Sequence, residues 1–383
     1  MSANDRILVT GDFCPINRIE KLISDGKYET VFNDFQTILK EASLALTNLE
    51  CPLTATVRTI SKTGPSLKSS PKVAEALAFA GFNLVALANN HIMDYGEEGL
   101  TSTIEICKKS NIDYVGAGRS NKTAKEVFYK TVGRNKVAIL NFAENEYSTT
   151  NGDYPGANPL DLVENYNDIK MAKANADFVF VIVHGGHEMY NLPSTRIRKT
   201  FRFFADAGAS AVIGHHTHCF SGYEVYNGTP LFYSLGNFIF DFPQKQDQKW
   251  NSGYAVEFSL NSKLEFRLVP YIQCADLPGV HLMSQDAKIK FDDEIERLNR
   301  IISDDNLLRI EFDNYCRSVE RMYLSFIEPH SIQGLHYLRN RKLLPSLLSK
   351  KKKMLYLNLV RCESHREVVS NLLDHRDILK LRL

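Results

Sequence analysis

Short apolar runs alternate with helical patterns from the start of the chain to about residue 275. The runs that predict strands cover residues 6–10, 45–50, 82–90, 135–142, 177–186 and 209–216. Between several of these runs, apolar side chains recur at helical spacing, in residues 71–81, 97–110 and 194–208. This alternation predicts an α/β domain in which helices pack against β-sheets.

The pattern becomes richer in strands after this alternating part. Residues 223–241 contain Asn227-Gly228, which is a strong signal for a tight hairpin turn. Residues 253–272 are typical of a second hairpin. We therefore expect two facing β-sheets flanked by helices, which is an αββα sandwich.

Charged amphipathic helix patterns replace the strands in the last part of the chain. They cover residues 292–327 and 366–383, among others. We therefore expect one domain in residues 1–275 and a helical C-terminal region in residues 276–383. The lysine run 350–353 is interpreted as a solvated helix end, with contact to an acidic partner as the alternative.

The composition is that of an ordinary globular protein. The chain has 383 residues, of which 44% are hydrophobic and 24% are charged, and its formal net charge is +1. This balance does not favour nucleic acid or a membrane surface as a general partner. The seven cysteines are scattered without a C-x-x-C pair, which argues against a disulfide framework.

The apolar runs are also too short for a membrane segment. The run at residues 7–9 is far shorter than a signal peptide core, and no later run is long enough to span a bilayer. We therefore expect a cytoplasmic protein without an integral membrane segment.

Polar side chains gather where the predicted strands end. They are Asp12, Glu50, Asn90 with His91, His184, and His216 with His218. One such residue would be interpreted as a turn or cap residue, but the carboxyl ends of strands in an α/β sheet form one ligand-binding edge. Carboxylates, an amide and imidazoles together suit a pair of divalent ions such as Mn, Fe or Zn.

The motifs around these residues resemble a known family. They read TNLECPLT, LANNHIMDYGEEGL, HGGHEMY, GASAVIGHHTHCFSGYEVYNG and YSLGNFIFD, in this order along the chain. The set resembles the calcineurin-like metallophosphoesterase superfamily, and most closely its CapA branch, the poly-γ-glutamate capsule biosynthesis proteins. The resemblance covers roughly residues 6–245 and implies a two-metal centre at the edge of two facing sheets.

The resemblance also implies roles for individual residues. The implied ligands are Asp12 and His218 for the first metal, Glu50 as the bridge, and Asn90, His184 and His216 for the second metal. His91 is implied to contact the phosphate or to protonate the leaving group. His215 is an alternative ligand within the histidine triplet.

Four further residues are left with two interpretations each. Cys14 occupies a position where the superfamily often has histidine, so it is either a metal ligand or a packing residue. Arg18 either pairs with a substrate anion or forms a surface salt bridge. Glu188 either supports a ligand imidazole or is an ordinary surface acid, and Asn237 either holds a turn or contacts substrate.

Two functions follow from the predicted site. The first is hydrolysis of a phosphoester on two divalent ions, with a phosphorylated or anionic small molecule or polymer as the substrate. The alternative is an accessory protein of capsule or poly-γ-glutamate synthesis that binds an anionic ligand without turnover. Nucleic-acid binding has only the lysine run to support it.

Overall fold

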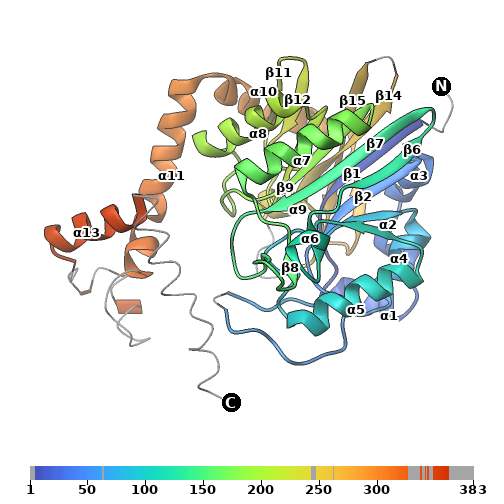
Figure 1. The fold of residues 1–383 in the computed structure, drawn as a ribbon, viewed down its shortest axis with the longest axis horizontal. Helices are drawn as coiled ribbons and strands as arrows, with labels where there is room; N and C mark the ends of the chain where they lie inside the picture. The colour runs from blue at the N-terminus through green and yellow to red at the C-terminus, as the bar shows by residue number, and fades with distance from the viewer. Residues whose placement is uncertain are drawn as a thin grey trace. The chain divides into compact units, whose positions relative to one another are not determined.

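The computed structural model describes residues 5–62, 64–242, 247–261 and 263–326, and near the C-terminus residues 337–338, 341, 343–344 and 348–361. The chain divides into two compact units, Met1–Arg309 and Ile310–Leu383. Figure 1 shows the strands and their flanking helices.

The larger sheet contains the first strand of the chain at its centre. Its order is β16 (Val280–Leu282), β15 (Leu264–Gln273), β14 (Ser252–Leu260), β1 (Arg6–Cys14), β2 (Leu44–Leu49), β3 (Leu84–Ala86) and β4 (Asp113–Val115). A further strand, β13 (Asn237–Phe240), pairs with the end of β1 in parallel. Strands β1 to β4 are parallel, so their carboxyl ends lie along the same edge.

The second sheet faces the first. Its order is β11 (Tyr223–Tyr226), β12 (Thr229–Phe232), β10 (Ala211–His215), β9 (Phe178–His184), β7 (Asn135–Ala143) and β6 (Phe128–Val132). Strands β7, β9 and β10 are parallel to one another. A small separate sheet pairs β5 (Ala117–Gly118) with β8 (Gly156–Ala157).

Helices cover the outer faces of both sheets. The helices in the larger unit are α1 (Arg18–Ser24), α2 (Tyr28–Phe32), α3 (Phe35–Glu41), α4 (Val73–Ala80), α5 (Gly96–Lys109), α6 (Asn121–Ala124), α7 (Leu162–Asn175), α8 (Thr195–Ala207), α9 (Gln248–Asn251) and α10 (Gln285–Ser303). Helices α7 and α8 pack against β9 and β10 (Figure 1). None of the helices in the described residues is long and apolar enough to cross a membrane.

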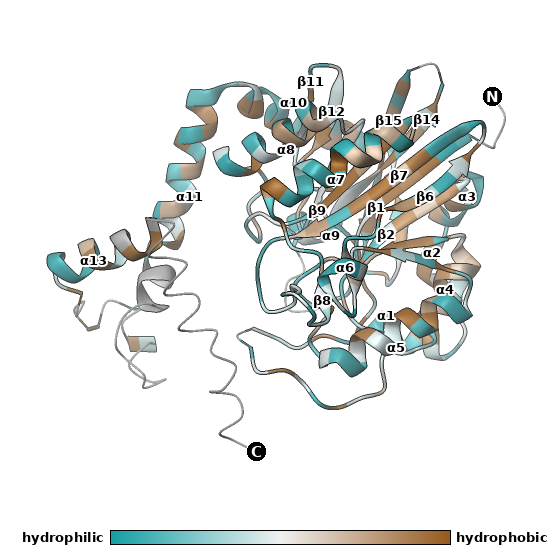
Figure 2. Ribbon diagram, in the orientation of Figure 1, coloured by the Kyte–Doolittle hydropathy of each residue, from teal (hydrophilic) through white to brown (hydrophobic). Residues whose placement is uncertain are grey.

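Alternation along the strands builds two apolar cores. Ile7 and Val9 of β1 belong to the core between the sheets, whereas Leu8 belongs to the core under the helices. The ring centroids of Phe180 on β9 and Phe258 on β14 lie 5.0 Å apart across the inner core. The central strands are accordingly the most apolar part of the ribbon in Figure 2. These layers confirm the expected αββα sandwich.

The expected strands and turns are confirmed, although several strands differ in length from the prediction; β1, for example, continues to Cys14 instead of ending near residue 10. Asn227 and Gly228 join β11 to β12 with φ angles of 49° and 84°, as a tight hairpin turn requires. Strands β14 and β15 form the second predicted hairpin. The strand expected over residues 82–90 is shorter, because pairing ends at Ala86 and the following residues form a turn.

The first compact unit extends beyond the boundary expected near residue 275. Helix α10 buries Phe291 and Ile295 against the sheets, and the centroid of the Phe291 ring lies 5.7 Å from that of Tyr254 on β14. The division into domains 1–275 and 276–383 therefore stays a prediction, while the compact unit itself ends at Arg309.

The second unit contains α11 (Asp305–Phe326) in part and α13 (Lys350–Arg361). The lysine run 350–353 forms the exposed first turn of α13, as the solvated-end interpretation expects. The helix expected over residues 366–383 lies outside the described residues.

Candidate metal centre

The two sheets bring the strand-end residues into one buried cluster. Asp12 lies near the end of β1, Glu50 follows β2, and His184 is the last residue of β9. His216 and His218 follow β10 directly. Because these strands end at the same edge, side chains far apart in the sequence become neighbours.

The cluster contains two overlapping groups of possible metal ligands. One group is Glu50, His184 and His216, and the other is Asp12, Glu50 and His218. Within each group the ligand atoms lie within 4.8 Å of one another, and all these residues are buried. Glu50 belongs to both groups, which is the position expected of a carboxylate that bridges two ions.

Glu50 shows why the cluster suits cations. Both of its carboxylate oxygens are buried without a hydrogen-bond partner among the described residues. The Nε2 atoms of His184 and His218 lie 3.6 and 3.7 Å from Glu50 Oε1. Burial, followed by the charges of Asp12 and Glu188, raises the pKa of Glu50 well above its usual value. Such a carboxylate is costly to bury alone, and two bound cations would compensate for it.

Asp12 is held in place by three neighbours. Asn48 Nδ2 donates a hydrogen bond of 2.8 Å to Oδ1, and the backbone N–H of His216 donates one of 3.1 Å to Oδ2. His215 Nδ1 lies 3.0 Å from Oδ1. Burial would raise the pKa of Asp12, but the hydrogen bond and charge of His215, together with the charges of His184 and His218, hold the pKa well below its usual value. Asp12 is therefore ionised, as a metal ligand must be.

The atoms expected to hold the second metal converge on one point. His184 Nε2 lies 3.0 Å from Asn90 Oδ1 and 3.1 Å from His216 Nδ1. Burial, followed by the charge of His216, lowers the pKa of His184 well below its usual value. A neutral imidazole is the form that binds a metal, so this environment favours the ligand state.

His218 is fixed by Asn237 and by aromatic rings. Its Nδ1 atom lies 3.0 Å from Asn237 Oδ1, and its ring centroid lies 5.0 Å from that of Trp250. The amide oxygen of Asn237 can only accept, so Nδ1 carries the proton and Nε2 presents its lone pair toward Glu50. Burial lowers the pKa of His218 to about 4.

Asn237 therefore holds a ligand in place within the protein. Its Nδ2 atom donates to the backbone carbonyls of His218 and Trp250, at 3.1 and 3.2 Å. Asn237 is fully buried, and these contacts occupy both ends of its side chain. Of its two interpretations, the geometry favours the turn-holding one over substrate contact.

The histidine turn adopts an unusual backbone. His216 and His218 have φ angles of 95° and 59°, which L-residues other than glycine rarely adopt. Such strain persists where the surrounding structure enforces it, and it is common at functional sites. His215, by contrast, ends β10 and belongs to neither ligand group, although its ring contacts Asp12.

His91 lies next to the cluster with a different set of contacts. Its Nδ1 atom lies 2.6 Å from Asp94 Oδ2, and Asp94 also forms an ion pair with Lys62. The Lys62 and Asp94 side chains are 5% and 0% exposed, so this pair is desolvated. His91 belongs to neither ligand group, which is compatible with its expected contact to substrate.

Sequence reasoning missed Asn48, Asp94 and Lys62. The Asn48 amide contacts both Asp12, as described above, and His184 Nδ1 at 3.1 Å, so it joins the two sheets. Asn48 precedes Glu50 by two residues, so the two side chains point to the same face of the strand. This spacing is the feature of the sequence from which Asn48 could have been predicted. Asp94 follows His91 by three residues in a turn, whereas nothing in the sequence pointed to Lys62.

Cys14 lies away from both ligand groups. Where β1 pairs with β13, the register shifts after Asp12, and the extra residue lies on β13, because Asp12 pairs with Asn237 and Phe13 with Ile239. Cys14 packs in the core under the helices, and its thiol is hydrogen-bonded to Cys51. Burial, followed by Cys51, raises the pKa of Cys14, so the thiolate form that binds metal is disfavoured.

The two remaining candidates also lie outside the ligand groups. Arg18 binds the buried carboxylate of Asp241 through Nε and Nη2, at 3.0 and 2.7 Å, and Nη2 also donates to the carbonyl of Cys274. This pairing matches the salt-bridge interpretation rather than the substrate one. Glu188 is exposed, and its negative charge contributes to the raised pKa of Glu50 and partly opposes the lowering of the pKa of His218.

Comparison with known proteins assigns a family. Residues 6–242 match the family described as bacterial capsule synthesis protein PGA_cap. The capsule biosynthesis protein CapA of Bacillus anthracis is 33% identical over 249 residues, which is 62% of this chain and 61% of that protein. The PGA biosynthesis protein CapA of Bacillus subtilis (strain 168) is 34% identical over 236 residues, or 60% and 62%.

A probable polyglutamine synthesis accessory protein of Mycobacterium tuberculosis is 29% identical over 213 residues, which is 52% of this chain and 56% of that protein. The chain spans about three-fifths of the length of the two CapA relatives. The family match covers more than half of this chain and includes every residue of both ligand groups. The chain therefore belongs to the bacterial capsule synthesis protein PGA_cap family.

Proposed function

We propose that the chain is a phosphoester hydrolase that depends on two divalent metal ions and acts in capsule or polyglutamate metabolism. The observation that carries the proposal is Glu50, whose buried carboxylate belongs to both ligand groups and has both oxygens unsatisfied among the described residues. Family membership and the names of the relatives support a capsule-related role. Mn, Fe and Zn all suit a carboxylate and imidazole site.

The bound ions would neutralise phosphate charge and lower the pKa of a nucleophilic water. The protein residues would hold this arrangement: Glu50 would bridge the ions, with Asp12 and His218 on one side. Asn90, His184 and His216 would lie on the other side. Asn48 and Asn237 fix the ligand orientations by hydrogen bonds. The chain therefore supplies a rigid, buried and anionic site, as phosphoester hydrolysis on two metals requires.

His91 supplies the proton in this proposal. Asp94 accepts a hydrogen bond from Nδ1, which leaves Nε2 to contact the phosphate or the leaving oxygen. The ion pair with Lys62 fixes Asp94, so the ring orientation is set before substrate binds. Loss of such a positioned acid typically slows turnover by about 10²–10⁴-fold.

An accessory role without turnover is the second candidate. The printed name of the M. tuberculosis relative, an accessory protein, favours it. The metal centre would then bind an anionic group of a polymer or its precursor. Neither candidate function involves nucleic acid, and the cytoplasmic location stays a prediction.

Metal analysis and a substrate screen test both candidates. Purified protein should contain about two transition-metal ions per chain, and Asp12→Ala and His216→Ala should each lower that content. A phosphoester screen with added Mn²⁺ should then show turnover that His91→Ala slows by about 10²–10⁴-fold while metal is retained. Metal binding without turnover of any phosphoester would favour the accessory role, and failure to bind Mn²⁺ or Zn²⁺ would contradict the metal centre itself.

A further inference from the structure

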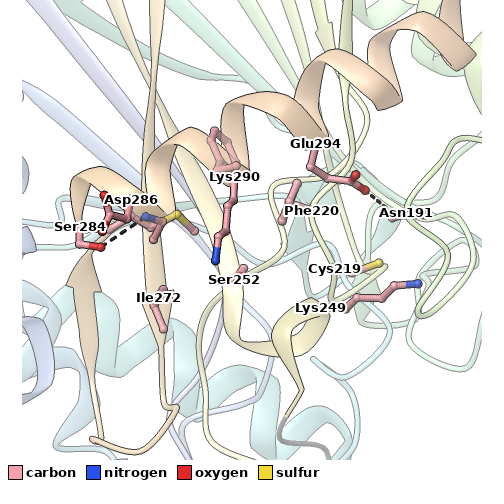
Figure 3. A pocket seen from close by; sticks show the side chains of 13 residues that line it. Asn191, Cys219, Phe220, Lys249, Ser252, Ile272, Ser284, Asp286, Lys290 and Glu294 are labelled. Atoms are coloured by element: carbon pink, nitrogen blue, oxygen red, sulfur yellow. Dashed lines mark hydrogen bonds between the residues drawn. The ribbon is translucent and has the colours of Figure 1, made fainter.

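A pocket of about 770 Å³ lies beside the metal centre, between α10 and the loop that follows His218 (Figure 3). Its apolar lining includes Phe220, Phe291, Ile272 and Met283. A pocket of this size accommodates an extended organic group rather than a single small anion. The metal ligands do not line it, so it is distinct from the metal centre.

The pocket and the metal centre share a wall. Cys219, which lines the pocket, directly follows the ligand His218. Lys249, which also lines it, directly precedes Trp250, whose ring packs on His218 at 5.0 Å between centroids. A molecule bound at the metals through one end is therefore close enough to extend into the pocket.

Two lysines give the pocket a cationic character. Lys290 extends from α10 into the pocket in Figure 3, and Lys249 lies near Cys219. Both side chains are exposed, and in the described part of the chain neither has a hydrogen bond or an ion pair. We name this site, defined by Lys249, Lys290 and the apolar lining, the lysine pocket.

Two acidic residues, Asp286 and Glu294, also line the lysine pocket, but in the described part of the chain neither forms an ion pair with Lys249 or Lys290. Glu294 accepts hydrogen bonds from Arg297, at 2.7 Å, and from Asn191, at 3.4 Å. Asp286 lies beside Ser284, at the side opposite Cys219 in Figure 3. The part of the lysine pocket next to the metal centre therefore carries positive charge above an apolar lining.

We propose that the lysine pocket binds a second acidic group of an extended substrate whose first anionic group is held at the metals. The substrate class is an organic phosphoester with a carboxylate at the other end of an apolar linker. The linker would pack on Phe220 and Phe291, and the carboxylate would pair with Lys290, whose amine extends into the pocket, while Lys249 would add positive charge to the same pocket. The inference rests on the proposed function, because the metal centre must hold the first group.

Binding of non-hydrolysable probes tests the lysine pocket independently of turnover. Isothermal titration with Mn²⁺-loaded full-length protein would compare ω-phosphonoalkanoates with alkylphosphonates over a series of linker lengths. At the best length, the carboxylate should tighten binding about three- to tenfold at low salt. The advantage should shrink as ionic strength rises, because these lysines are exposed.

The double variant Lys249→Met/Lys290→Met should lose this advantage while its affinity for alkylphosphonates stays unchanged. Lys288→Met is the matched control, because Lys288 is exposed on the same helix but does not line the pocket, and it should keep the advantage. Equal binding of the two series by the wild type at every length, or an advantage that survives in the double variant, would overturn the inference. A wild type that shows the advantage yet hydrolyses no phosphoester would support the lysine pocket and contradict only the catalytic proposal.

Discussion

His91 Nδ1 lies 2.6 Å from Asp94 Oδ2 within a buried turn, and Lys62, from the long connection between β2 and α4, forms an ion pair with the same carboxylate. Asp94 Oδ2 also accepts a hydrogen bond of 2.7 Å from the backbone N–H of Leu67. An ionised carboxylate can only accept, so it fixes both the ring plane and the tautomer of His91. Catalytic function at His91 therefore depends on residues that do not touch the metals.

Asp94→Asn should lower kcat and leave metal content unchanged. The amide would still occupy the space, but it no longer stabilises a proton on His91, so we expect a loss of about 10²–10⁴-fold in kcat. Steady-state kinetics on the best phosphoester from the screen, together with elemental analysis, measures both quantities.

Asp113→Asn provides the control, because Asp113 is an exposed carboxylate on β4 outside both ligand groups. Lys62→Met should reproduce part of the Asp94→Asn defect, since it removes the ion pair that fixes Asp94. Wild-type kcat in Asp94→Asn would show that His91 acts without this carboxylate.

Glu50 makes the stability of metal-free protein dependent on pH. Its pKa is raised in the folded state, so the folded protein binds a proton more readily than the unfolded chain. The contribution of Glu50 to stability is therefore fully present below its usual pKa of 4.5 and is lost as pH rises toward the folded pKa. Glu50→Gln should remove this loss, so metal-free Glu50→Gln should be more stable than metal-free wild type at neutral pH.

Thermal unfolding in chelator across a pH series tests this expectation. Asp12 acts in the opposite direction, because its lowered pKa gives stability that is lost only as pH falls, so its contribution is fully present at neutral pH, where the two proteins are compared. Saturating Mn²⁺ should reverse the order, since Glu50 is then compensated in the wild type. If metal-free Glu50→Gln unfolds at a lower temperature than metal-free wild type at neutral pH, the burial argument is wrong.

Much of the candidate site could be predicted because parallel strands align their carboxyl ends. Asp12, Glu50 and His184 each come at the end of an apolar run, and the sheets bring these ends together. The hairpin turn at Asn227-Gly228 was equally predictable, because few residues tolerate positive φ. In both cases the local sequence determines where a strand ends or turns, and the pairing of strands in the sheet then determines which of these ends become neighbours.

The parts that could not be predicted depend on contacts across the fold or on local irregularity. Lys62 reaches Asp94 from a long connection, and no periodic pattern fixes where such a side chain points. Cys14 follows Asp12 by only two residues, yet it packs beside Cys51 in the core under the helices, which no pattern in the sequence indicates. Helix α10 belongs to the first compact unit because Phe291 packs against the sheets, and this tertiary contact has no local signal in the sequence.

Asn237→Ala should weaken binding of the first metal selectively. Asn237 fixes the tautomer and the ring orientation of His218, and loss of such a partner typically lowers metal affinity by about 10–100-fold. Titration of metal-free protein with Mn²⁺ should therefore show one weakened site beside one unchanged site. Asn261→Ala, in the turn between β14 and β15, is the control and should bind both ions normally. Unchanged affinity at both sites in Asn237→Ala would contradict the role of Asn237.

Cys14 should behave as a packing residue. It is fully buried beside Cys51 and outside both ligand groups, so Cys14→Ala should keep full metal content and activity. The small cavity left behind should cost about 1 kcal/mol of stability, measured by denaturant unfolding. Cys14→His should be the harmful change, because a larger polar ring must enter a close-packed core beside Leu49 and Leu53. Loss of one metal ion in Cys14→Ala, with retention in Cys14→His, would instead identify Cys14 as a ligand.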